Sequence, residues 1–128
     1  MKRVIMAGLV LSLAATASAD IREYCASVFH DSYSLQEICI QQEENAKEQV
    51  ESSGAPSDIK GYCAKTFKDS YSLQASCIRQ EEDAKDQIEA SAAPAKIKKY
   101  CAKTFSGSYS LQATCIQQET EAKKRLGY

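Results

Sequence analysis

The sequence lacks the residue groupings that most catalytic and metal sites need. It has one histidine, His30, and no closely spaced cysteine pair of the kind that structural zinc sites use. Without Cys-x-x-Cys, thioredoxin-like redox chemistry and covalent haem attachment are also excluded. No glycine-rich phosphate-binding loop is present. We therefore expect no catalytic residue, no cofactor and no metal ligand in this chain.

An excess of basic residues and long apolar runs are also missing. The 16 Lys and Arg residues are opposed by 17 Asp and Glu residues, whereas nucleic-acid-binding domains usually show a clear basic excess. We therefore expect no nucleic-acid partner. The longest apolar run, from Val4 to Ala15, is shorter than the roughly 20 residues that a membrane-spanning helix needs. We expect no membrane span in the remainder of the chain.

That apolar run is typical of a secretory signal. Lys2 and Arg3 precede it, and the small residues Ala17, Ser18 and Ala19 follow it. We expect residues 1–19 to be a signal peptide, cleaved after Ala19. This predicts an exported bacterial protein, periplasmic or secreted. All six cysteines lie beyond the cut, and an even number in an oxidising compartment indicates disulfides.

An internal repeat with a period of 38 residues dominates the remaining sequence. Each copy carries Ile, Tyr-Cys-Ala, Phe, Ser-Tyr-Ser-Leu-Gln, Cys-Ile, Gln-Glu and Ala-Lys in the same order. Self-similarity at a fixed period indicates a repeat architecture. We expect three units, residues 20–57, 58–95 and 96–128.

Each unit predicts two antiparallel helices, so the expected fold class is all-α: three tandem helical hairpins. A short helix of about 10–12 residues precedes a polar turn, and a longer one of about 18–20 follows it. Asp31 or Ser32 can cap the longer helix in the first copy, and Pro56 and Pro94 end the units as linkers. The apolar faces in the first copy are Ile21, Tyr24, Cys25, Val28 and Phe29, then Leu35, Cys39, Ala46 and Val50.

The cysteines favour one pairing among the 15 that six cysteines allow. The two cysteines of a unit lie equally far from the predicted turn, and both fall on apolar helix faces. The expected disulfides therefore close each unit identically, adding about 3 kcal/mol each in the chain-entropy model. They are Cys25–Cys39, Cys63–Cys77 and Cys101–Cys115.

The longer helix extends beyond its partner, which leaves its far half uncovered. Val50 and Ile88 are therefore expected to pack on a neighbouring unit, which favours a stacked array, although the proline linkers also allow independent beads. Glu43 and Lys47 lie four residues apart, as do their counterparts in the other copies. We expect these to be solvated surface pairs.

Two polar residues that recur in every unit are candidate surface contacts. Each glutamine either bonds the free carbonyls that end the shorter helix or belongs to a row that reads a ligand. Each tyrosine either packs over the tip of its hairpin or contacts a partner. These candidates are Tyr33, Gln36, Tyr71, Gln74, Tyr109 and Gln112.

Charge changes sign along the repeats. Residues 20–57 carry a net charge of −6, residues 58–95 carry −2, and residues 96–128 carry +5. Opposite ends could attract each other between molecules, or the basic end could bind an anionic envelope surface. Variation among solvated residues would produce the same gradient.

The run Tyr-Cys-x3-Phe-x3-Tyr-Ser-Leu-Gln-x2-Cys-Ile resembles a cysteine-paired motif of uncharacterised exported bacterial proteins. The resemblance covers nearly all of residues 20–128 and implies no activity. The spacing differs from the Cys-x9-Cys of mitochondrial coiled-coil-helix proteins. We expect a non-catalytic module that binds an unknown protein or envelope component. The alternatives are a small secreted enzyme or effector that uses His30 or a carboxylate, and a self-assembling structural protein.

Overall fold

The computed structural model describes residues 19–128, so the expected signal peptide lies outside the described residues except for Ala19. This part of the chain contains six helices and no strand, which confirms the all-α class. The short helices have 10 residues each, and the long ones have 20, 20 and 17. The helices are α2 (Ala19–Val28), α3 (Tyr33–Ser52), α4 (Ser57–Thr66), α5 (Tyr71–Ala90), α6 (Ala95–Thr104) and α7 (Tyr109–Arg125).

Local chemistry explains where the long helices begin. The hydroxyl oxygens of Ser32, Ser70 and Ser108 accept hydrogen bonds from the backbone N–H three residues later, at 3.2, 3.2 and 3.3 Å. Serine is a preferred residue at this position because its side chain satisfies one of the free N–H groups of the first turn. The structure thus selects Ser32 over Asp31 as the cap of α3.

A disulfide joins the short and long helices of every hairpin. The bonds are Cys25–Cys39, Cys63–Cys77 and Cys101–Cys115, with Cα–Cα distances of 5.8, 5.6 and 5.7 Å. All six cysteines are buried, and each pair belongs to the apolar cluster of its own hairpin. The predicted pairing is confirmed.

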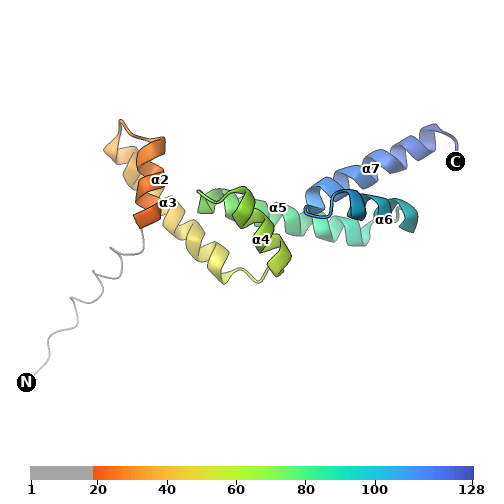
Figure 1. Ribbon diagram of the computed structural model, residues 1–128, viewed down its shortest axis with the longest axis horizontal. Coiled ribbons are helices and arrows are strands. Elements are labelled where there is room, and N and C mark those ends of the chain that lie inside the picture. Colours follow the sequence, from red (N-terminus) through yellow and green to blue (C-terminus); the bar gives the residue numbers. More distant parts are fainter. Residues whose placement is uncertain (1–18) are drawn as a thin grey trace, which may run out of the picture.

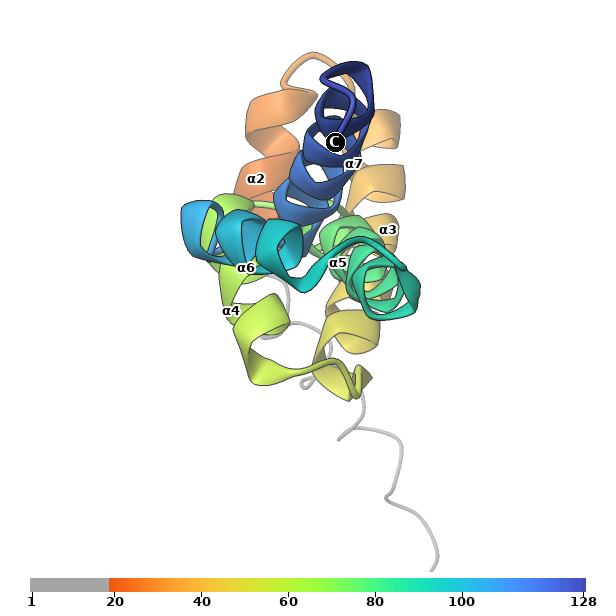
Figure 2. The same cartoon turned by 90° about the vertical axis from the view of Figure 1, so that its right-hand side faces the viewer.

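The hairpins form a continuous array rather than separate beads. Helix α3 packs against α5, and α5 packs against α7, so that the first and third hairpins lie at opposite ends of the long axis (Figure 1). Val50 packs against the core of the second hairpin and Ile88 against that of the third, as expected. Seen along the long axis, the hairpins point in different directions, which shows that the array twists (Figure 2).

The expected apolar faces are partly wrong at the hairpin tips. Val28 is exposed, and the leucine in the first turn of each long helix, which was expected to be buried, is 45, 48 or 50 % exposed. The short helix ends before it can cover that turn. These leucines are Leu35, Leu73 and Leu111. No helix among residues 19–128 is both long and apolar enough to cross a bilayer.

Candidate interaction sites at the junctions and ends of the array

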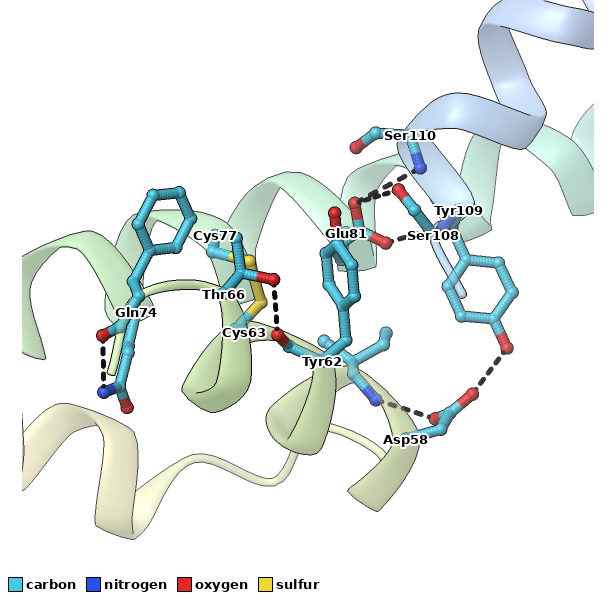
Figure 3. Close-up of a disulfide and its surroundings, with 12 residues drawn as sticks. Asp58, Tyr62, Cys63, Thr66, Gln74, Cys77, Glu81, Ser108, Tyr109 and Ser110 are labelled. Atoms are coloured by element: carbon cyan, nitrogen blue, oxygen red, sulfur yellow. Dashed lines mark hydrogen bonds between the residues drawn. A yellow bond between two sulfur atoms is a disulfide. The ribbon is translucent and has the colours of Figure 1, made fainter. Parts of the chain in front are cut away.

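A buried glutamate of one long helix binds the N-terminus of the next at both junctions. The Glu81 carboxylate accepts hydrogen bonds from the Ser108 hydroxyl at 3.0 Å and from the backbone N–H groups of Tyr109 and Ser110 at 2.6 and 3.3 Å (Figure 3). The first N–H groups of a helix lack partners within the helix, and the positive end of the helix dipole attracts an anion. The carboxylate therefore provides an acceptor for the free N–H groups and a negative charge at the positive end of the helix dipole.

Glu43 makes the matching contact at the first junction. Its carboxylate accepts hydrogen bonds from the Ser70 hydroxyl at 3.1 Å and from the Tyr71 N–H at 2.7 Å. Glu43 and Glu81 are only 5 % and 4 % exposed. At each junction a carboxylate therefore accepts from a serine hydroxyl and from a backbone N–H that lie 27 and 28 residues further along the chain.

This contact corrects the expectation that these glutamates form solvated pairs with lysines four residues later. The next hairpin covers the helix face that carries Glu43 and Glu81, whereas Glu119 is exposed. The sequence did contain a sign that this glutamate has a structural role. Glutamate recurs at this position in all three copies, while the following position holds Glu44, Glu82 and Thr120.

The tyrosine after each capping serine packs onto the preceding hairpin. Tyr71 contacts the cluster around the first disulfide, and Tyr109 contacts the cluster around the second. The Lys47 ammonium lies 5.8 Å from the centre of the Tyr71 ring, and the Lys85 ammonium lies 5.9 Å from that of Tyr109, within cation–π range. Both junctions therefore repeat a three-part contact of glutamate, tyrosine and lysine.

Tyr109 has a further polar partner. Its hydroxyl donates a hydrogen bond to Asp58 Oδ2 at 2.9 Å (Figure 3). This bond is the largest cause that raises the pKa of Tyr109 above its ordinary value of 10.0, followed by burial. Loss of the phenol proton would place two negative oxygens side by side.

The recurring glutamines act within their own hairpins. The amide nitrogens of Gln36, Gln74 and Gln112 donate to the carbonyls of Phe29, Phe67 and Phe105, each at 2.9 Å. This confirms the predicted bond to the carbonyls that follow the short helix. Contact of these glutamines with a partner stays a prediction.

The candidate tyrosines do not share one environment. Tyr71 and Tyr109 lie at the junctions, on the preceding hairpin rather than over their own hairpin tips. Tyr33, their counterpart in the first repeat, is 88 % exposed. Contact of any of the three with a partner molecule stays a prediction.

Among the described helices, none packs on the third hairpin as α5 packs on α3 or α7 on α5, so we call this side of the third hairpin its open end. A depression of about 530 Å³ lies there, lined in part by Tyr128 and with Ile97, Tyr100 and Glu119 also in its wall. The counterparts of these wall residues at the second junction are Ile59, Tyr62 and Glu81, which line a depression together with Tyr109. No hairpin-tip tyrosine of the described residues reaches the depression of the third hairpin.

His30 lies in the turn before α3, where its Nδ1 is 2.9 Å from Asp31 Oδ1. Both side chains are exposed. Within residues 19–128, no three His, Cys, Asp or Glu side chains are grouped so that they could hold a metal ion. At the two junctions a carboxylate instead binds a helix N-terminus. The depressions at the second junction and at the end of the third hairpin are each lined by an isoleucine, a tyrosine and a glutamate at equivalent positions. No protein-family model, curated protein or solved structure matches this chain.

Proposed function

We propose that this chain is a non-catalytic, exported repeat protein that acts as a binding or cell-envelope interaction module. The observation that supports the proposal is a leucine that is exposed at the same position in all three hairpins. Leu35, Leu73 and Leu111 are each about half exposed at a hairpin tip. A single exposed leucine is ordinary, but three copies on one cross-linked frame allow several weak contacts to act together.

The disulfides support the proposed compartment. Such bonds persist in oxidising environments and are rare in reducing ones, and each hairpin holds one. The signal-like residues 1–19 point to bacterial export, into the periplasm or beyond the cell. The proposed relationship to exported proteins with a repeated Cys-x13-Cys motif rests on the same residues. The proposed partner is a protein or another envelope component.

The proposal can be tested by replacing the three leucines together with serine. Because these side chains are already half exposed, we expect the triple variant to keep its helical circular dichroism and its disulfides. The oxidised chain from Asp20 to Tyr128 would be immobilised and exposed to envelope extract of the source bacterium. We expect the unsubstituted protein to retain a specific component and the leucine variant to lose most of it.

The matched control replaces Gln42, Gln80 and Gln118 with alanine. These glutamines also recur once per hairpin and are exposed, but they make no apolar contribution. Retention of the component by this control and its loss from the leucine variant would support the proposal. Retention by both variants, or no specific component on the unsubstituted protein, would reject it.

A further inference from the structure

We propose that copies of this chain associate head to tail, with the tip of the first hairpin of one copy docked into the open end of the third hairpin of another. The proposed occupant is therefore a second copy of the same chain. The contact would repeat the two junctions that already exist inside the molecule. This contact does not rest on the proposed function, which uses the leucines at the hairpin tips. Leu73 and Leu111 stay exposed although their hairpin tips are docked.

The first hairpin presents the docking residues without a partner among the described residues. Ser32 and Tyr33 occupy the positions of Ser70 with Tyr71, and of Ser108 with Tyr109. The serines of the inner tips are buried and their tyrosines are partly covered, whereas Tyr33 is 88 % exposed. The N–H of Tyr33 is equivalent to the donors that Glu43 and Glu81 bind.

The third hairpin presents the matching socket. Glu119, Lys123 and Leu126 stand one repeat after Glu81, Lys85 and Ile88. Glu119, Lys123 and Leu126 border the same depression, together with Ile97 and Tyr100. The carboxylate, the ammonium and the apolar side chain of an inner junction are therefore all available at this end.

Leu126 also fits an apolar contact between the long helices. Its counterpart Val50 packs in the cluster that contains Ile78 of the following helix. Leu126 is 70 % exposed. Ile40, which is the counterpart of Ile78, is only partly buried. A docked second copy would bring Ile40 to Leu126 and cover both side chains.

The charges of the two ends are complementary. Residues 20–57 carry −6 and residues 96–128 carry +5, which favours encounter between unlike ends over encounter between like ends. Lys96 stands where Asp58 accepts the Tyr109 hydroxyl. This change is compatible with docking because a tyrosine hydroxyl accepts a hydrogen bond from an ammonium as well as donating one.

Head-to-tail contact has a geometric consequence. The two surfaces differ, so each added copy leaves one free tip and one free socket. Such heterologous contacts do not close on themselves unless the rotation happens to form a ring, and they otherwise build open chains. Because the array already twists (Figure 2), the proposed assembly is a helical filament of hairpins.

The test is sedimentation velocity of the oxidised chain from Asp20 to Tyr128 over a wide range of concentration. We expect the sedimentation coefficient to rise with concentration. Tyr33→Ala removes the aromatic side chain from the contact, and Glu119→Gln keeps an acceptor oxygen but removes the negative charge that the helix N-terminus attracts. Each substitution should weaken association by about tenfold or more. Glu121→Gln, which removes the same charge from an exposed position on the same helix, should change association little. Circular dichroism should show the same fold in all variants, since all three altered positions are exposed in the monomer.

Mixing the two variants makes the test specific for a head-to-tail contact. Tyr33→Ala keeps a working socket and Glu119→Gln keeps a working tip, so the mixture should form one-to-one pairs that do not grow further. Absence of association in the unsubstituted protein would overturn the proposal. Association that weakens with added salt but is unchanged by both substitutions would also overturn the proposal, because such association would indicate unspecific charge pairing.

Discussion

The middle hairpin and the outer hairpins share most of their residues but bury different ones. The middle hairpin both inserts its tip into the first hairpin, through Ser70 and Tyr71, and receives the tip of the third, through Glu81. Among residues 19–128, the first hairpin only receives a tip and the third only inserts one. The same side chain is therefore buried or exposed according to whether a neighbouring hairpin lies next to it.

This difference indicates a quasi-one-dimensional protein, in which stability comes from individual units and from the contacts between neighbours. A hairpin of two helices buries little apolar surface, so its disulfide and its neighbours both matter. The middle hairpin has two neighbours, and its loss removes both junctions. Substitutions at equivalent positions in different hairpins should therefore have unequal effects on stability.

The largest effect should follow removal of the middle disulfide. Changing Cys63 and Cys77 to alanine removes a cross-link that contributes about 3 kcal/mol in the chain-entropy model and opens the core between both junctions. We expect one cooperative loss of helix at lower urea concentration. After the matched change of Cys101 and Cys115 to alanine, the first two hairpins should still unfold in a separate transition at higher urea concentration. Circular dichroism during urea unfolding distinguishes these outcomes, and identical curves would contradict the neighbour dependence.

A smaller effect should follow removal of a junction glutamate. Glu81→Ala leaves a helix N-terminus buried without its acceptor, which should lower the free energy of unfolding by about 1–3 kcal/mol. Glu119→Ala at the open end should change it by less than about 0.5 kcal/mol when measured in dilute solution. Glu81→Gln keeps an amide oxygen as acceptor, so its loss in the free energy of unfolding should lie between those of the two alanine variants. Equal losses for Glu81→Ala and Glu119→Ala would show that the contact adds nothing at the junction.

The sequence was sufficient for the features that depend on one hairpin. Helical spacing, the polar turns and the 38-residue period predicted the helix pairs. The equal distance of both cysteines from the turn of their hairpin predicted all three disulfides. The bond from Gln36 to the Phe29 carbonyl was also predictable. These contacts lie within a few turns of each other along the chain, so local geometry determines them.

Contacts between hairpins were harder to predict. Glu43 lies 28 residues from Tyr71, and its burial depends on the angle at which two long helices cross. Helical periodicity alone assigned a charged residue there to solvent. It also assigned Leu35 to the core, although the short helix ends too early to cover it. Periodicity identifies the faces of a helix but not the length over which each face is covered.

The smallest expected effect concerns pH at the second junction. The hydrogen bond to Asp58 raises the pKa of Tyr109 above 10.0, so the folded state holds this proton more tightly than the unfolded state does. The resulting stabilisation is complete below pH 10.0 and is lost as pH rises through the folded-state pKa. Asp58→Asn removes the negative charge and should lower the pKa of Tyr109 toward its ordinary value. Ultraviolet titration of the tyrosines, with Tyr109→Phe to identify the signal, would measure the shift. An unchanged titration in Asp58→Asn would show that the hydroxyl does not depend on this carboxylate.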